Sequence, residues 1–144
     1  MISWPDGSRA LADAARVARL ATGDALGNPH VVPICYVLLD DRICSVVDEK
    51  PKRRPTQLKR SRNLRQNARA AVLVDLWDED WARLAWVMMR GRARLDVDGD
   101  EYAVATAALR AKYDQYRAIR FSPRVHPLIV IDIDEVLAWR ARPA

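Results

Sequence analysis

Cysteine, histidine and long apolar runs are all scarce in this chain of 144 residues. The two cysteines, Cys35 and Cys44, lack the CxxC spacing of zinc and redox sites and stand in apolar segments, so we expect buried thiols without a disulfide framework or structural zinc. No apolar run approaches the roughly 18 residues of a membrane-spanning helix, and the first residues do not resemble a signal peptide. We therefore expect a soluble, cytoplasmic protein with no membrane partner.

Motifs for several common chemistries are also missing. Neither GxGxxG nor GxxxxGK[ST] occurs, so no Rossmann or P-loop phosphate site can be argued. His30 and His126 each stand beside a proline without a nucleophile or ligand pattern, which favours a structural role for both. Asp132, Asp134 and Glu135 alternate along the last apolar segment, where we expect a solvated strand edge and no metal site. The sequence identifies no catalytic side chain.

The chain does have a local excess of positive charge. Nine cations and no acid lie within residues 50–69, a charge of +9, whereas the whole chain is +5 from 24 basic and 19 acidic residues. The remainder therefore sums to −4. Such a cluster in a mildly acidic domain favours the binding of one polyanionic molecule at one place.

Apolar periodicity and turn residues predict a single domain over residues 1–144. The segments neighbour one another along the sequence with short links, which favours antiparallel pairing. We expect a mainly β fold with α-helices, a small antiparallel barrel with flanking helices. Because a barrel of this size is filled with side chains, a sizeable ligand should lie on its rim or at a homodimer contact. Helices are expected within 8–20, 57–67 and 100–117, and strands at 17–22, 30–39, 42–47, 70–76, 84–95 and 127–139.

Five short segments, taken in order, resemble the pyridoxamine 5′-phosphate oxidase-like split-barrel superfamily. Within it the chain is most similar to the branch of oxidoreductases that use coenzyme F420, a deazaflavin. The similarity extends from about Leu20 to Trp139. The segments that carry it are 21–22, 27–36, 46–52, 62–64 and 87–93.

The resemblance implies an FMN-binding-like split barrel that forms a homodimer with two cofactor sites at the subunit contact. It also implies that the flavin-like ring lies against the second and third strands. On this chain those positions are Val32, Pro33 and Tyr36 on one strand and Ser45 and Val46 on the next. Tyr36 is also a candidate proton donor.

The basic segment would then hold the cofactor's phosphate and acidic tail. Lysine and arginine form charge-assisted hydrogen bonds to phosphate, and an exposed helix start near Thr56 offers free N–H groups. Arg60 is the first candidate because it stands three residues before Asn63, where the superfamily commonly carries a phosphate-binding cation. The further candidates are Lys50, Lys52, Arg53 and Lys59. The alternative is that these cations form the solvated face of a surface helix.

Three tryptophans, Trp77, Trp81 and Trp86, occur close together around one predicted turn. Ordinary core or rim packing would account for them. The functional alternative is that Trp77 or Trp86 of one subunit forms a wall of the ring pocket of the other.

These observations lead to one functional prediction and three alternatives. The prediction is hydride transfer between coenzyme F420 and a small organic acceptor whose identity stays open. An FMN-dependent oxidase or reductase of the pyridoxamine 5′-phosphate oxidase type is the first alternative, and a flavin- or deazaflavin-binding protein without turnover is the second. The third is nucleic-acid binding by the basic stretch, which we disfavour because the stretch has no aromatic residue to stack on bases.

Overall fold

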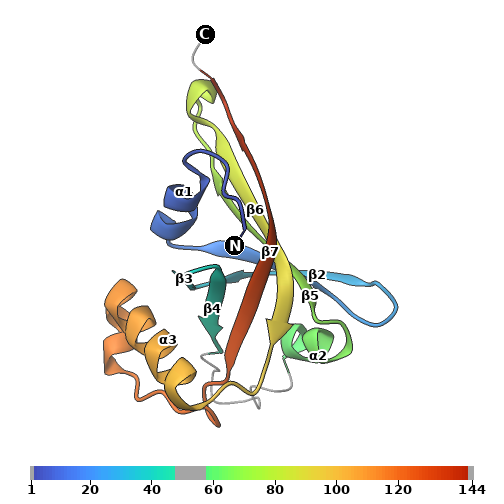
Figure 1. The fold of residues 1–144 in the computed structure, drawn as a ribbon, viewed down its shortest axis with the longest axis vertical. Helices are drawn as coiled ribbons and strands as arrows, with labels where there is room; N and C mark the ends of the chain where they lie inside the picture. The colour runs from blue at the N-terminus through green and yellow to red at the C-terminus, as the bar shows by residue number, and fades with distance from the viewer. Residues whose placement is uncertain (1, 48–57, 143–144) are drawn as a thin grey trace.

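The computed structural model describes residues 2–47 and 58–142, which form a curled antiparallel sheet with three α-helices (Figure 1). None of these helices has the length and hydrophobicity needed to cross a bilayer. The helices are α1 (Ser8–Ala14), α2 (Lys59–Gln66) and α3 (Gly99–Lys112), with short 3-10 helices η2 (Trp81–Arg83) and η3 (Asp114–Ala118). The strands are β1 (Ala18–Gly23), β2 (Pro29–Ile34), β3 (Val37–Leu39), β4 (Arg42–Val46), β5 (Arg69–Leu76), β6 (Ala85–Arg94) and β7 (Leu128–Arg140).

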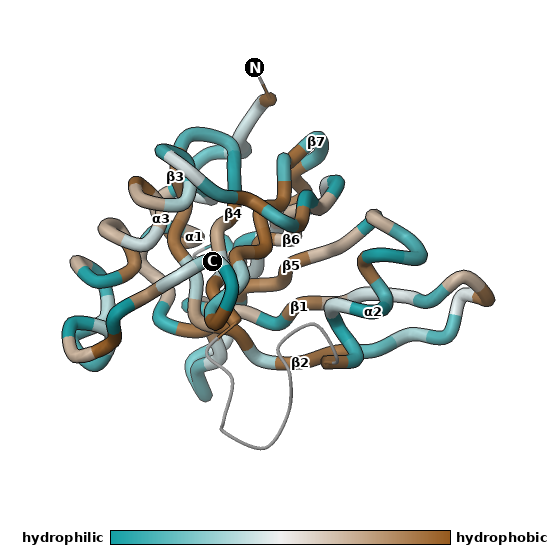
Figure 2. Tube along the Cα trace, turned by 90° about the horizontal axis from the view of Figure 1, so that it is seen from below, coloured by the Kyte–Doolittle hydropathy of each residue, from teal (hydrophilic) through white to brown (hydrophobic). Residues whose placement is uncertain are grey.

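The seven strands form one sheet in the order β2-β1-β5-β6-β7-β4-β3, with every neighbouring pair antiparallel. The predicted antiparallel pairing is confirmed. The edge strands β2 and β3 follow one another in the chain but are not paired, so the sheet is a half-barrel and not a closed cylinder. Figures 1 and 2 show α2 beside β1 and β2, on the opposite side of the molecule from α3.

The prediction of one strand over residues 30–39 was wrong. The chain leaves the sheet at Cys35 and Tyr36, and β3 then pairs with β4 while β2 pairs with β1. At this break the backbone of Tyr36 has no hydrogen-bond partners on a neighbouring strand. The hydroxyl of Tyr113 replaces them: it accepts from the Tyr36 N–H at 3.1 Å and lies 3.1 Å from the Tyr36 carbonyl and 3.0 Å from the Arg16 carbonyl.

Apolar side chains fill both faces of the sheet around β4 and the first half of β7. Ile43 and Ile131 point into the barrel core with Leu20 and Met89. Their neighbours on the same strands, Cys44 and Val130 among them, face the second core under α3. Strands buried on both faces read as continuous apolar runs, which explains the absence of polar alternation at residues 128–131. The interior of the half-barrel is therefore occupied by side chains.

The third helix ends earlier than predicted. It stops at Lys112, and Tyr113 is extended (φ −120°, ψ 111°) before η3 begins. The ring of Tyr113 is buried and its hydroxyl is held at the strand break, so the α-helix ends before this residue. This bend places Lys112 and Tyr116 on the same side of the molecule.

Asp134 and Glu135 are exposed and lie beyond the pairing of β7 with β4, which ends at Asp132, so the predicted solvated edge is confirmed for these two residues. Asp132 differs, because it is paired with both β4 and β6. No group of three or more His, Cys, Asp or Glu residues in the described part of the chain could hold a metal ion. The carboxylates instead pair with arginines of other strands. The pairs are Asp132 with Arg94, Asp134 with Arg69, and Glu135 with Arg90.

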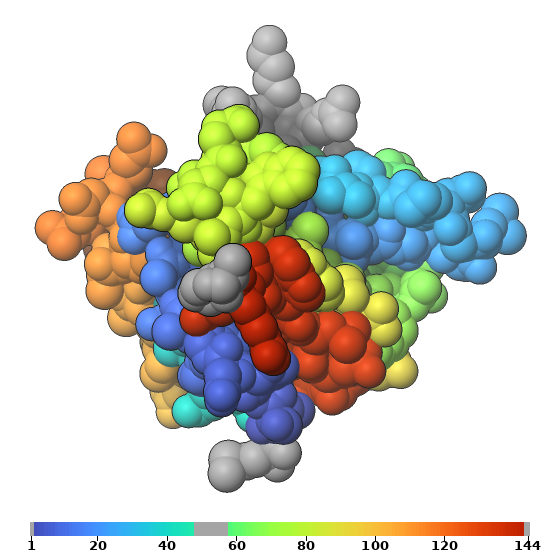
Figure 3. Space-filling model, turned by 90° about the horizontal axis from the view of Figure 1, so that it is seen from above, coloured from blue at the N-terminus to red at the C-terminus, as the bar shows by residue number. Residues whose placement is uncertain are grey.

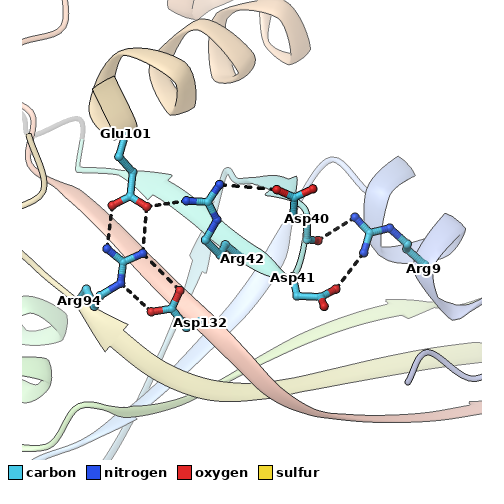
Figure 4. A network of polar contacts seen from close by, with 7 residues as sticks. All are labelled: Arg9, Asp40, Asp41, Arg42, Arg94, Glu101 and Asp132. Atoms are coloured by element: carbon cyan, nitrogen blue, oxygen red, sulfur yellow. Dashed lines mark hydrogen bonds and ion pairs between the residues drawn. The ribbon is translucent and has the colours of Figure 1, made fainter. Parts of the chain in front are cut away.

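A network of ion pairs joins the start of α3 to the sheet (Figure 4). Arg94 binds Asp132 at 2.6 Å and Glu101 at 2.7 Å, and Glu101 also contacts Arg42 at 2.5 Å. Beyond the Asp40–Asp41 turn, Arg9 of α1 binds Asp41 at 3.2 Å. Hydrogen bonds and charge from Arg94, with a smaller contribution from Arg42, hold the pKa of Glu101 below its usual value of 4.5. Because Glu101 stands between two arginines, it is the residue that connects them.

We expect Glu101→Gln to lower the melting temperature at neutral pH and to have no effect in acid. The pKa of Glu101 is lowered by folding, so its contribution is present above 4.5 and is lost as the pH falls through the folded-state value. Thermal unfolding from about pH 7 to about pH 3 measures this difference. Glu135→Gln removes an exposed carboxylate paired with Arg90 alone and should change little at any pH. A Glu101→Gln difference that persists unchanged at acid pH would contradict the assignment.

Gly91 lies at the register shift between β6 and β7, where the two backbones approach closely. A Cβ atom at this position would stand 2.1 Å from the carbonyl oxygen of Asp132. Since backbone cannot rotate away as a side chain can, only glycine fits here.

Gly91→Ala should therefore destabilise the fold by about 1–3 kcal/mol, the usual cost of overpacking. Chemical denaturation gives this value. Gly23→Ala is the matched control, because a Cβ there meets its nearest atom at 3.7 Å, an ordinary contact. Equal stability of the two variants would show that β7 can shift to accept the methyl group.

Candidate functional site

A cleft of about 280 Å³ opens on the rim of the half-barrel, where β2, β4, α2 and η3 meet. Four of the residues predicted from the sequence line it: Pro33, Ser45, Val46 and Arg60. They come from three elements that are distant in the sequence. The remaining lining residues are Val17, Ile34, Cys35 and Tyr116.

Arg60 is the most unusual residue of this cleft. It lies in the first turn of α2, and its Nε atom is buried without a hydrogen-bond partner among the described residues. A buried donor left unpaired costs about 1–3 kcal/mol. No side chain in the described residues caps the start of α2 by a hydrogen bond. The first N–H groups of a helix have no partner within the helix and point out of its start. Both features fit an anionic ligand.

Ser45 and Val46 are fixed in the cleft by the pairing of β4 with β7, in which Ser45 faces Ile129. The Ser45 hydroxyl donates to the Cys35 carbonyl at 2.8 Å and keeps lone pairs that can accept a hydrogen bond. Cys44, the next residue, points into the second core, and burial raises the pKa of its thiol to about 11. The prediction of a buried, inert thiol is thus confirmed for Cys44, whereas Cys35 is half-buried at the cleft wall.

Folding pairs three of the nine cations that the sequence concentrates in residues 50–69 with carboxylates. Lys59 lies 3.8 Å from Asp24, Arg65 lies 3.1 Å from Asp96, and Arg69 pairs with Asp134. These acids come from other parts of the chain, and they balance three of the five cations that the structure describes in this segment. Within the described residues, Arg60 and Arg62 are the cations of the segment that form no ion pair. The predicted Lys50, Lys52, Arg53 and Thr56 lie outside the described residues.

Three other predicted residues lie in the interior. Val32 is opposite Leu20 and packs against the barrel core. Asn63 is fully buried and its Nδ2 donates to Thr22 at 3.0 Å, which joins α2 to β1. The side chain of Tyr36 is also fully buried, its hydroxyl donates to the Ala12 carbonyl, and burial raises its pKa. We therefore drop Tyr36 as a proton donor.

The tryptophans lie away from this cleft. Trp77 and Trp81 are 67% and 69% exposed at the end of the β5–β6 hairpin, the yellow-green segment on the surface in Figure 3. Trp86 is half-buried and lies opposite Trp139 on β7. None of them lines the Arg60 cleft of its own chain among the residues described.

A second cleft, of about 380 Å³, adjoins the first and was not predicted from the sequence. The two share Cys35 and Tyr116 as lining residues. Lys112 and Arg16 bring positive charge to it. The sequence places these two cations 96 residues apart, and only the bend after α3 brings them together. No local pattern could have shown that proximity.

The sequence profile of the family described as pyridoxamine 5′-phosphate oxidase matches residues 5–140. The chain therefore belongs to the pyridoxamine 5′-phosphate oxidase-like split-barrel family, as the resemblance predicted. A comparison with curated protein sequences found no match. The assignment to the deazaflavin branch stays a prediction.

Solved structures confirm the split-barrel fold. A heme-binding protein from Mycobacterium smegmatis matches with a TM-score of 0.75 and 24% identity over 96% of this chain, which spans 55% of that protein. An FAD-binding protein from Mesorhizobium loti matches with a TM-score of 0.68 and 23% identity, covering 91% of this chain and 90% of that one. A conserved hypothetical protein from Mycobacterium tuberculosis matches with a TM-score of 0.74 and 19% identity, covering 98% of this chain and 88% of that one.

Proposed function

We propose that this chain is an oxidoreductase that binds coenzyme F420 and transfers a hydride between this deazaflavin and a small organic acceptor. The observation that carries the proposal is the rim cleft, where the buried Nε of Arg60 has no partner among the described residues and lies with Pro33, Ser45 and Val46 in the lining. These residues fit a cofactor with an apolar ring and an anionic arm. When bound, the deazaflavin supplies a transferable hydride.

The residues of the chain would bind and orient such a cofactor without acid–base catalysis. Pro33 and Val46 offer apolar surface for a ring, and Ser45 offers a hydrogen-bond acceptor at its edge. Arg60 offers a charge-assisted hydrogen bond to a phosphate oxygen, which would satisfy its Nε. Hydride transfer requires mainly orientation and exclusion of water, so the absence of an evident catalytic side chain in the cleft is compatible with an enzyme.

The alternatives share the same cleft and differ in the ligand. FMN also combines an apolar ring with a phosphate, so it would use Arg60 in the same way. Heme is a further candidate because a structurally similar protein is described as heme-binding. However, neither His30 nor His126 lines the Arg60 cleft, so the described residues offer no histidine ligand there. The apolar surface of Pro33 and Val46 beside the buried Nε of Arg60 fits a flavin or deazaflavin.

Replacing Arg60 should weaken cofactor binding and leave the fold intact. We expect Arg60→Gln to raise the Kd for coenzyme F420 about tenfold or more, because a charge-assisted hydrogen bond to phosphate is lost. The melting temperature should not fall, since Arg60 has no ion pair among the described residues and its buried Nε is unsatisfied without a ligand. Ligand fluorescence polarisation measures the affinities for coenzyme F420 and FMN, and a titration followed by Soret absorbance measures the affinity for hemin.

Arg62→Gln is the matched control for this experiment. Arg62 lies on the same helix, is exposed and also forms no ion pair in the described part of the chain, so its loss removes the same charge away from the cleft. Equal affinity of the Arg60 and Arg62 variants would remove Arg60 from the site. Tighter binding of FMN than of coenzyme F420 would favour the oxidase alternative, and binding of neither would reject the proposal.

We also propose that the protein acts as a homodimer formed through the outer face of the sheet. Facing positions of five strands form a largely apolar row across it, namely Pro33, Arg19, Leu73, Met88 and Leu137. The described helices pack on the other face or beside β3 and β4, through residues such as Ala12, Leu64 and Leu109.

This outer face of the sheet carries several large apolar side chains that are exposed in the single chain. Val31 is 61% exposed, Trp139 is 47% exposed, and Leu73 and Leu137 are each more than one-third exposed. An extended apolar patch of this kind is typical of a protein interface. Two copies that pair here would bring Trp77 or Trp86 of one subunit toward the ring site of the other, as predicted from the sequence.

Leu73→Asp should dissociate this dimer, because it places a charge in the middle of the apolar row. Analytical ultracentrifugation should give about twice the 16.4 kDa chain mass for the wild type and the chain mass for the variant. Leu26→Asp is the control, because Leu26 is 88% exposed in the turn between β1 and β2, away from the row. A wild-type monomer, or a Leu73→Asp dimer of unchanged affinity, would reject this interface.

A further inference from the structure

The second cleft contains a lysine whose amine is buried and forms no ion pair with the described residues. The Nζ atom of Lys112 has no hydrogen-bond partner among the described residues. It lies 4.0 Å from the ring centroid of Tyr36 and 5.4 Å from that of Tyr113, so it is in contact with two aromatic rings. Such contacts favour the charged amine but leave its N–H groups unsatisfied.

Arg16 provides a second cation in the same cleft. Its Nη2 donates to the Lys112 carbonyl at 2.7 Å, and its guanidinium lies 4.7 Å from the ring centroid of Tyr113. These contacts fix the guanidinium in place while most of its five N–H groups stay available to a ligand. The cleft therefore holds two oriented cationic groups whose hydrogen-bonding capacity is largely unused.

The acids near this cleft do not cancel these cations. Asp114 lines the cleft, but its side chain is 88% exposed and lies 3.3 Å from Arg117. Asp13 interacts electrostatically with Lys112, yet burial and the charge of Arg16 together hold the pKa of the amine below its usual value. With two cations and one carboxylate in its lining, the cleft has a net charge that suits a monoanion.

We infer that the second cleft binds a small organic carboxylate, held by Arg16 and Lys112 against walls that include Tyr113 and Tyr116. Its volume of about 380 Å³ is at the lower end of the roughly 300–1,000 Å³ typical of small-molecule sites. The aromatic walls favour a planar molecule. Because Cys35 and Tyr116 line both clefts, a carboxylate here would lie beside the proposed ring site. This last step rests on the proposed function: the second cleft is the site of the hydride acceptor, and the acceptor is then a small carboxylic acid.

The test is a titration with benzoate in the absence of any cofactor, followed by NMR on protein labelled with 13C at the lysine ε-carbons. The chain has four lysines, Lys50, Lys52, Lys59 and Lys112, so the spectrum is simple and Lys112→Met assigns the resonance. We expect a saturable shift of the Lys112 signal and a higher pKa for its amine, because a bound carboxylate favours the ammonium form. Benzamide, which has the same shape without the charge, should have neither effect.

Calorimetry with variants locates the binding site. Lys112→Met keeps an apolar stem beside Tyr36 and should weaken benzoate binding about tenfold, as should Arg16→Gln. Arg124→Gln is the control, because it removes one positive charge from an exposed position outside the cleft. Unchanged affinity in the folded Lys112→Met variant, or an equal response of wild-type Lys112 to benzamide, overturns the inference.

The result can be separated from the fate of the proposed function. If coenzyme F420 binds through Arg60 and benzoate does not bind, the carboxylate site alone is rejected. If benzoate binds through Lys112 and Arg16 while coenzyme F420 and FMN do not bind, the carboxylate site is supported and its role as the acceptor site is rejected.

Discussion

The Tyr113 hydroxyl at the break between β2 and β3 is the contact on which the arrangement of this molecule depends. A buried backbone cannot leave the sheet unless its polar groups find other partners. Here a single side-chain hydroxyl accepts from the Tyr36 N–H and lies within hydrogen-bond distance of the Tyr36 and Arg16 carbonyls. It thereby connects the segment before β1, the strand break and the end of α3.

Both clefts result from this one connection. The strand break exposes Cys35 as their shared wall, and the end of α3 at Lys112 lets η3 place Tyr116 against it. Arg16, held by its bond to the Lys112 carbonyl, completes the second cleft. Because the barrel interior is filled with side chains, a ligand near the strand break binds at the rim and not inside the barrel.

Electrostatics then determines which cations remain available to a ligand. Lys59, Arg65 and Arg69 meet carboxylates from distant segments, and Arg94 and Arg42 are used to fix α3 (Figure 4). Exposed pairs of this kind contribute little stability each, but they remove positive charge from the surface. Among the described residues, Arg60 remains available in one cleft, and Arg16 and Lys112 in the other. Arg60 and Lys112 each have a buried nitrogen that lacks a partner in this part of the chain. The neighbouring clefts thus suit a cofactor phosphate and a small carboxylate.

The sequence by itself determined the strands, the antiparallel class and the family. Their signals are local, since apolar runs such as residues 128–131 and short links depend on near neighbours alone. It also selected Arg60, Ser45 and Val46 as candidates, and these three share a cleft. Only the tertiary structure decided that Tyr36 is buried, that the strand of residues 30–39 is divided, and that Arg16 meets Lys112. Each of these depends on a contact between segments tens of residues apart, and neither composition nor periodicity encodes such contacts.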